Sequence, residues 1–329
     1  MTFNDNAQLD TSQVTSGGSG GFGGGGGGMG GGPVVGGIGG LILMLIFALF
    51  GGNLTGGPDS SGGGSTGSSG SSYGSGLNGY AQDTQDVSGS NDSVAQAIEQ
   101  CKTGADANRD DTCRIVGTVN AVQDYWGSAL PKFTNGRTQY ENVPTVIFSG
   151  QTSSGCGTAS SQMGPFYCPT DRKVYIDAAF FQELTNKYGA DGGALAKEYV
   201  VAHEYGHHVQ DLLGALGRAQ QDPKGAESGS VRTELQADCY AGIWVAHATE
   251  SKDKNGNTLL KPVTDDDIKS ALSAASAVGD DRIQQKAQGR VTPESWTHGS
   301  SEARQKWFMT GYEKGDLNSC DTFNVDSVE

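Results

Sequence analysis

Apolar side chains recur at helical spacing in several segments after residue 92. This spacing predicts helices over 93–101, 193–216, about 231–248, 265–278 and 300–312. The segment 114–130 shows the pattern most clearly, because four of its apolar residues fall on one helical face: Ile115, Val119, Val122 and Trp126. Glycines at 214 and 217 predict the end of the helix that begins near 193.

Two shorter segments show strand patterns. Residues 143–150 are mostly apolar, and residues 172–177 alternate Val174 and Ile176 with polar neighbours, as a half-buried or edge strand does. Because the strands precede a run of helices and do not alternate with them, the pattern predicts an α+β fold. We expect one domain over residues 92–329, with a small sheet and a mainly helical C-terminal part.

The first 91 residues have a different composition, since 30 of the 53 glycines precede residue 91. Residues 1–33 are polar and then almost entirely glycine, which predicts disorder, and the Gly/Ser-rich residues 51–91 are typical of a flexible linker. Residues 34–50 form an uncharged apolar run at the short end of what spans a bilayer. We expect a single transmembrane anchor there. A cleaved signal peptide is the alternative, although no A-x-A pattern follows the run.

Charge adds two constraints. The formal net charge is −15 and no Lys/Arg cluster is present, so nucleic acid is not an expected partner. No Lys or Arg precedes Lys102, so the positive-inside rule does not orient the anchor. Nothing in the sequence indicates an oligomeric state.

All six cysteines follow the apolar run. An even number there predicts three disulfides in an oxidising compartment, and therefore a single-pass cell-membrane protein whose C-terminal domain lies outside the cytoplasm. Six free thiols in a cytosolic protein are the alternative. A 12-residue separation occurs twice, which favours two local pairs and leaves a third: Cys101 with Cys113, Cys156 with Cys168, and Cys239 with Cys320.

Residues 203–207 read HEYGH, an HExxH pattern. On a helix, residues four apart lie on one face about 6 Å apart along the axis, so His203 and His207 can bind the same metal ion. Glu204 is the next residue after His203, about 100° round the helix axis, and can reach a water bound to that ion. His208 falls on the opposite face, which we expect to be packed. The alternative is a helix with two surface histidines that bind no metal.

Two histidines do not complete a zinc site, so a third ligand is expected elsewhere. The next predicted helix carries Glu234 and Asp238, again four residues apart. Glu234 is the expected third ligand, and Asp238 the expected acceptor for the free N–H of a ligand imidazole. A pair of solvated carboxylates is the alternative.

The segments YCPTDRKVYID, HEYGHHVQ, ELQADCYAGIW and WTHGSSEARQKWFMTGY together resemble the predicted neutral zinc metallopeptidase family of bacteria, over about residues 92–325. HExxH followed by ExxxD is also similar to the gluzincin arrangement. The resemblance implies a zincin-like fold and one Zn²⁺ held by His203, His207 and Glu234, with Glu204 as general base. Many members begin with a basic N-terminus, and this chain does not.

The expected activity is zinc-dependent endopeptidase hydrolysis of a peptide or protein, with the water activated by zinc and Glu204. We expect the substrate to pair with the strand at 172–177. His298 is the candidate that stabilises the tetrahedral intermediate, ahead of Tyr167 and Tyr175, and a structural contact is its alternative role. A non-catalytic, zinc-stabilised binding or assembly protein of the cell envelope is the alternative function.

Overall fold

A computed structural model describes residues 1–18 and 87–329. Its main sheet has the strand order β1-β2-β6-β5. The first three of these strands run parallel and β5 pairs antiparallel with β6. Their bounds are β1 (Val14–Ser16), β2 (Thr145–Phe148), β6 (Lys173–Asp177) and β5 (Phe166–Cys168). A separate hairpin joins β3 (Gln151–Ser154) to β4 (Gly157–Ser160).

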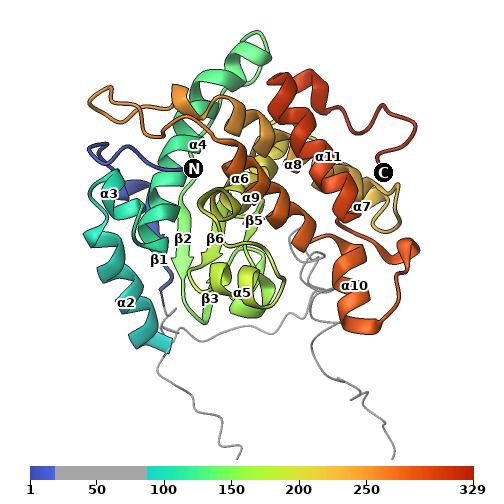
Figure 1. Ribbon diagram of the computed structural model, residues 1–329, viewed down its shortest axis with the longest axis horizontal. Coiled ribbons are helices and arrows are strands. Elements are labelled where there is room, and N and C mark those ends of the chain that lie inside the picture. The colour runs from blue at the N-terminus through green and yellow to red at the C-terminus, as the bar shows by residue number, and fades with distance from the viewer. Residues whose placement is uncertain (19–86) are drawn as a thin grey trace, which may run out of the picture.

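Helices flank the sheet on both sides (Figure 1). One group precedes β2 in the chain: α2 (Val87–Gln100), α3 (Gly104–Ala107) and α4 (Asp111–Phe133). The others follow the strands: α5 (Phe180–Asn186), α6 (Ala194–Leu212), α7 (Gly217–Gln221), α8 (Gly229–Ala246), α9 (Asp265–Ala277), α10 (Asp280–Gln288) and α11 (Ser301–Lys314). The helix α6 packs against α4, α8 and α9. The prediction of an α+β fold with a mainly helical C-terminal part is confirmed.

Short 3-10 helices connect these elements: η1 (Thr11–Gln13), η2 (Ser161–Met163), η3 (Ala248–Glu250), η4 (Pro293–Ser295) and η5 (Leu317–Cys320). The alternation at 172–177 predicts a half-buried or edge strand, and this is wrong, because four of the five residues of β6 are buried and β6 is an inner strand of the sheet. Its counterpart β6 pairs with β2 on one side and β5 on the other. Within the described chain, β5 and β1 are the outer strands.

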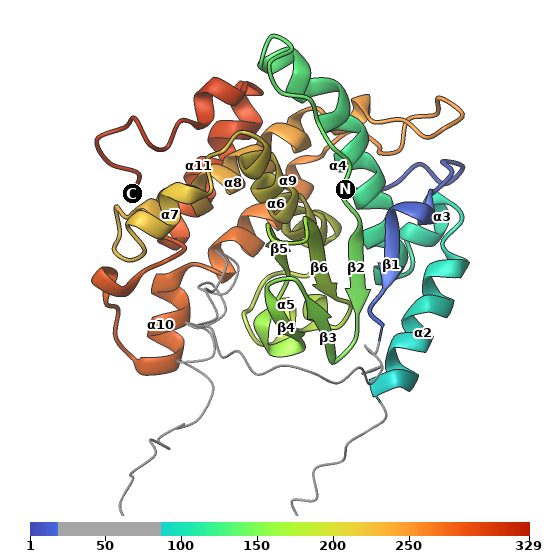
Figure 2. The same ribbon diagram turned by 180° about the vertical axis from the view of Figure 1, so that it is seen from behind.

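Residues 1–18 are part of the folded domain, which corrects the prediction of disorder for 1–33 over that stretch. Figure 2 shows β1 beside α2, at one end of the sheet. Phe3 is fully buried, and its ring lies against Gly117 of α4, where a Cβ would come within 2.6 Å of it. Asn120 accepts a hydrogen bond from the N–H of Asp10 and donates one to its carbonyl. These long-range contacts order a segment that contains few apolar residues.

No helix in the described ranges 1–18 and 87–329 is long and apolar enough to cross a membrane. The predicted anchor, 34–50, and the predicted linker up to residue 86 lie outside the described residues. A single crossing at 34–50 would put β1 and β2 on opposite sides of a bilayer, yet these strands are hydrogen-bonded neighbours. The predictions of a transmembrane helix and of a single-pass location in the cell membrane are therefore wrong.

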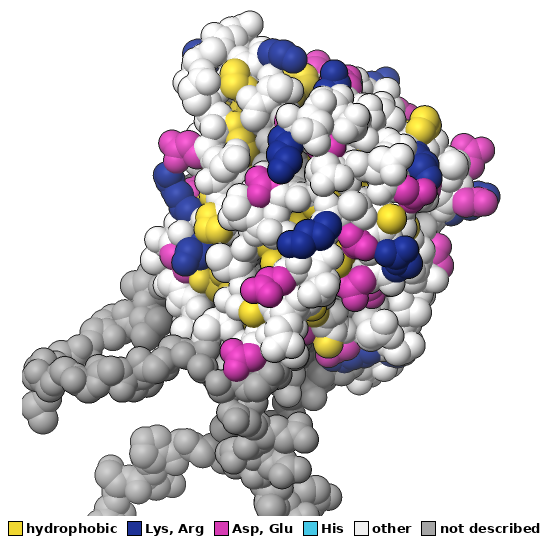
Figure 3. All heavy atoms as spheres, turned by 90° about the vertical axis from the view of Figure 1, so that its left-hand side faces the viewer, with side chains coloured by type: hydrophobic (Ala, Val, Ile, Leu, Met, Phe, Trp, Pro, Cys, Tyr) yellow, Lys and Arg dark blue, Asp and Glu magenta, His cyan; other side chains and the backbone are white. Residues whose placement is uncertain are grey.

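The chain has a formal net charge of −15, but its surface is not acidic on every face. On the face shown in Figure 3, Lys and Arg side chains are interspersed with Asp and Glu side chains across the described part of the surface. This face therefore presents mixed charge.

The structure confirms all three expected disulfides: Cys101–Cys113, Cys156–Cys168 and Cys239–Cys320. The first joins the start of α4 to the residue after α2, and the second ties the β3–β4 turn to β5. The third links α8 to η5 across a separation of 81 residues. It therefore fixes the C-terminal segment against a helix of the candidate site.

Replacing Cys239 and Cys320 together by serine is expected to lower the free energy of unfolding by about 2–5 kcal/mol, because the unfolded chain regains the freedom of a long loop. Chemical denaturation measures this change. Bound zinc is expected to stay unchanged, since the expected donors are other residues, His203, His207 and Glu234. Loss of zinc from a stably folded double variant would instead assign Cys239 to the metal.

Two glycines allow α8 and α11 to pack closely. A Cβ built on Gly311 would lie 1.9 Å from the carbonyl oxygen of Cys239, and one built on Gly242 would lie 2.0 Å from that of Phe308. Because both obstacles are backbone atoms, a larger residue requires the helices to separate. The close approach of the two backbones at these glycines allows α11 to pack against α8 beside the candidate site.

Gly311→Ala is therefore expected to lower the free energy of unfolding by about 3 kcal/mol, at the upper end of overpacking costs. Thermal and urea denaturation measure the effect. Gly127→Ala is the matched control, because Gly127 is exposed on α4 with open space around it. Alanine should stabilise that position by about 0.5–1 kcal/mol. Equal stabilities for the two variants would contradict the close packing.

Candidate metal centre

The helix α6 carries His203, Glu204 and His207 on one buried face. Its other face packs on the sheet, where the hydroxyl of Tyr205 lies 2.9 Å from Thr145 Oγ1. The imidazole of His208 belongs to that packed face. Its Nε2 lies 2.7 Å from the carbonyl oxygen of Glu141, and its Nδ1 lies 3.1 Å from the hydroxyl of Tyr167. The expectation that His208 lies away from the HExxH face is confirmed.

The helix α8 brings a carboxylate to the same point. Ser228 caps its start by accepting a hydrogen bond from the backbone N–H of Val231. Gly206 lets α6 and α8 approach, since a Cβ there would lie 2.9 Å from the carbonyl oxygen of Ala237. As a result Glu234 faces the HExxH helix.

Three donor atoms converge between these helices. Glu234 Oε2 lies 3.1 Å from His203 Nε2, and Glu234 Oε1 lies 3.4 Å from His207 Nε2. The donor atoms of the three residues all lie within 4.8 Å of one another. His207 Nε2 is buried and has no hydrogen-bond partner among the described residues. Two imidazoles and one carboxylate with an orphaned ring nitrogen fit a zinc ion with one further coordination position.

The opposite ring nitrogens are held by a second set of polar groups. His203 Nδ1 lies 2.8 Å from Asp238 Oδ1, and His207 Nδ1 lies 2.8 Å from Gln210 Oε1. An acceptor at Nδ1 leaves Nε2 of each ring free to bind a metal. Asp238, the acceptor expected from the sequence, thus lies against the imidazole of His203. Gln210 was missed, although its position three residues after His207 on the same helix is a usable signal.

Asp238 is itself held by Arg304 of α11, which the sequence prediction also missed. Arg304 Nε lies 2.8 Å from Asp238 Oδ2 and Nη2 lies 2.9 Å from Oδ1, in a bidentate pair. The hydroxyl of Tyr199, one helical turn before His203, also donates to Asp238. Because all three groups are buried, this network fixes the position of His203.

The electrostatics of the cluster favour a cation. Burial opposes charge on His203, but Asp238 and Glu234 raise its pKa to about 10. Burial likewise opposes charge on Glu234, yet the two imidazoles hold the pKa of its carboxyl well below the usual range. Burial raises the pKa of Glu204. Positive charge is thus stabilised at the point where the three donors meet.

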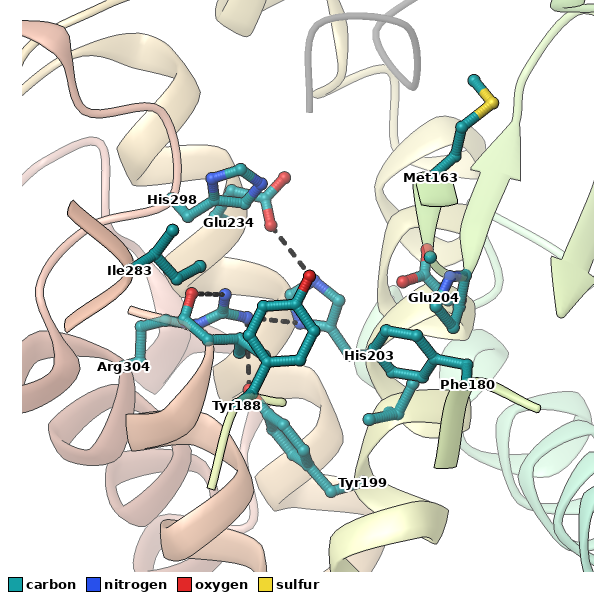
Figure 4. Close-up of a pocket in the computed structure, with 14 residues that line it drawn as sticks. Met163, Phe180, Tyr188, Tyr199, His203, Glu204, Glu234, Ile283, His298 and Arg304 are labelled. Atoms are coloured by element: carbon teal, nitrogen blue, oxygen red, sulfur yellow. Dashed lines mark hydrogen bonds and ion pairs between the residues drawn. The ribbon is translucent and has the colours of Figure 1, made fainter. Parts of the chain in front are cut away.

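His298 lies in the loop before α11, and Figure 4 shows its ring beside Glu234. Its Nδ1 lies 3.2 Å from Asp280 Oδ1 and 2.9 Å from Thr297 Oγ1. Asp280 raises the pKa of His298 against the effect of burial. Asp280 also accepts hydrogen bonds from the backbone N–H groups of residues 297, 298 and 299, so the loop conformation positions the imidazole.

The two tyrosines considered as alternatives to His298 are engaged elsewhere. Tyr175 donates to Asp171 and stacks on Phe166, and Tyr167 donates to Asp211. Neither side chain is among the described residues that line the cavity at the metal centre. Of the three candidates His298, Tyr167 and Tyr175, it is therefore His298 that lies in the cavity beside Glu234.

A cavity opens beside the cluster (Figure 4). Figure 4 shows it between Glu204, Phe180 and Met163 on one side and His298, Ile283 and Arg304 on the other. His203, Glu204 and Glu234 all line it. A molecule in the cavity would therefore contact two residues of the candidate donor set, His203 and Glu234, together with Glu204.

Comparison with known proteins agrees with this geometry. The model of the family described as "Putative neutral zinc metallopeptidase" matches residues 52–323. The Mycobacterium tuberculosis protein Rv2575 is 56% identical over 229 residues, which cover 69% of this chain and 76% of that protein. The Escherichia coli protein YpfJ is 42% identical over 231 residues, covering 68% and 76%.

No solved structure matches the chain. The family match covers most of the described domain, including both helices of the candidate metal centre and the His298 loop. The relatives are similar over the greater part of their own length. The chain therefore belongs to the neutral zinc metallopeptidase family.

Proposed function

We propose that the protein is a zinc-dependent endopeptidase in which His203, His207 and Glu234 hold one Zn²⁺. The observation that carries this proposal is the separation of roles among four buried groups. Three donors meet at one point, while the carboxylate of Glu204 lines the cavity outside the donor set. A purely structural zinc site would have a fourth protein ligand and no use for Glu204.

When bound, Zn²⁺ supplies Lewis acidity and lowers the pKa of a water ligand toward about 7. Glu204 accepts the proton from the attacking water and returns it to the amine that leaves. Its buried position and raised pKa suit a group that alternates between protonated and ionised forms. His298, oriented by Asp280, donates a hydrogen bond to the oxyanion that develops at the carbonyl.

Asp238 and Gln210 keep the two imidazoles in the tautomer with a free Nε2. Gln210 in turn donates to the carbonyl oxygen of Thr233, at 2.8 Å, and to Gln236 Oε1, at 3.0 Å. It thereby connects the HExxH helix to α8. The cleaved bond of the substrate lies beside His203, Glu204 and Glu234, where these residues line the cavity.

Gln210→Leu is expected to weaken zinc binding by about 10–100-fold, because His207 loses its orienting acceptor. Competition with a chromogenic chelator measures the dissociation constant. Gln305→Leu is the matched control, since Gln305 donates to the carbonyl oxygen of Leu272, away from the centre. A similar affinity in both variants would show that Gln210 does not support the metal.

The endopeptidase assignment is tested by incubating the zinc-loaded protein with long unstructured peptides and identifying the new ends by mass spectrometry. Cuts within the chain, abolished by a chelator, are expected. Stepwise removal of terminal residues would make the protein an exopeptidase. Intact peptides after zinc loading would contradict peptidase activity.

A further inference from the structure

The cavity beside the metal centre has an apolar wall built from separate elements. Phe180 begins α5, Tyr188 follows that helix, Val200 lies on α6, Val278 follows α9 and Ile283 lies on α10. Figure 4 shows Phe180 next to Glu204, and Ile283 on the opposite side with His298. The rings of Phe180 and Tyr188 lie next to each other, tilted by 41°, at a centroid distance of 6.4 Å. Together they form an apolar surface within reach of the reacting groups.

The charged groups that line the same cavity are either paired or assigned to the reaction. Arg304 is paired with both oxygens of Asp238, and His298 is paired with Asp280. Glu234 belongs to the proposed donor set, and Glu204 is the proposed general base. An anionic side chain entering the cavity would therefore lose its hydration without gaining an unpaired cationic partner among the described lining residues, and a cationic one would compete with the roles of Glu204 and Glu234. An apolar side chain has no charge whose hydration could be lost, and burying its surface in the cavity is favourable.

The position of this wall limits which part of a substrate reaches it. His203 and Glu204 line the cavity together with Phe180 and Ile283. A peptide whose carbonyl lies at the metal therefore directs a side chain from one of the two residues at the cleaved bond toward the wall.

We propose that this cavity is a specificity subsite for a large apolar side chain, aliphatic or aromatic, on a residue adjacent to the cleaved bond. The proposal rests on the proposed function and names its substrate class. Phe180, Tyr188 and Ile283 are the residues that determine the preference.

Binding of hydroxamate dipeptide analogues to the zinc-loaded protein tests the subsite without requiring turnover. Three probes differ in one side chain: isobutyl, methyl or carboxymethyl. Calorimetry is expected to show isobutyl binding about 10–50-fold more tightly than methyl, because it buries three more carbon atoms. Carboxymethyl should bind most weakly. Equal affinities, a preference for carboxymethyl, or no binding of any probe would overturn the subsite.

Variants localise the effect. Ile283→Trp fills the cavity and should remove the advantage of isobutyl while zinc remains bound. Ile283→Ala enlarges the cavity and should favour a benzyl probe over isobutyl, which keeps the test open if the tryptophan variant does not fold. Val291→Trp is the matched control, because Val291 is 41% exposed. If the probes rank alike in the Ile283 variants and the control, the wall is not the subsite.

The outcome is separable from that of the proposed function. Equal probe affinities in a protein that cleaves peptides would remove the subsite and leave the peptidase standing. The expected ranking in a protein that cleaves no peptide would remove the peptidase and leave an apolar ligand site beside the zinc.

Discussion

Glu204→Gln is expected to reduce peptide cleavage by about 10²–10⁴-fold, the usual contribution of a general base. Glutamine keeps the size and polarity of the side chain but cannot accept the proton from water. The three proposed metal donors are unchanged, so the variant should retain one zinc per chain. Because Glu204 is buried and its pKa is raised by that burial, removing its charge should not destabilise the fold.

Initial rates on a quenched peptide, together with metal analysis of the same samples, measure this prediction. Glu99→Gln serves as a control, since Glu99 is an exposed residue of α2 far along the chain from the centre. Its rate should equal that of the wild type. Full activity in a zinc-loaded Glu204→Gln variant would remove Glu204 from the mechanism.

His207→Ala is expected to weaken zinc binding by about a hundredfold or more. The free energy of zinc binding at structural sites with four ligands is about 10–16 kcal/mol, so loss of one ligand costs several kcal/mol. Cleavage should fall with occupancy at low zinc. The structure offers the adjacent residue as a matched comparison, because His208 is equally buried but lies on the other face of α6.

His208→Ala should keep the zinc and lose stability by about 1–3 kcal/mol, since Glu141 and Tyr167 lose a hydrogen-bond partner. Equilibrium dialysis and denaturation distinguish the two variants. Loss of zinc from the folded His208 variant, with retention in the His207 variant, would reverse the assignment of the two histidines.

The candidate centre was predictable because its main signals are local. Helical periodicity separates the HExxH face of α6 from the face of Tyr205 and His208, and the four-residue spacing of Glu234 and Asp238 identifies α8. The cysteine spacing also predicted the disulfides. Arg304 was not predictable on such grounds, because it reaches Asp238 from α11 only after the fold forms.

The N-terminal region shows why the rest could not be predicted. Phe3 and Val14 are isolated apolar residues in a polar stretch, so composition indicated disorder. Their partners are distant in the sequence: Phe3 fits against Gly117, and Val14 pairs with Thr145 of β2. A three-residue strand has too short a pattern to detect. The membrane prediction failed in the same way, since it relied on a local apolar run and could not include the pairing of β1 with β2.

Zinc titration of the chelator-treated protein tests the central claim most directly. Protein freed of metal receives zinc in steps, while cleavage of one peptide and bound metal are measured together. The account predicts no cleavage at the start, a linear rise, and a plateau at one zinc per chain. Undiminished cleavage by the metal-free protein, or binding of one zinc without any cleavage, would contradict it.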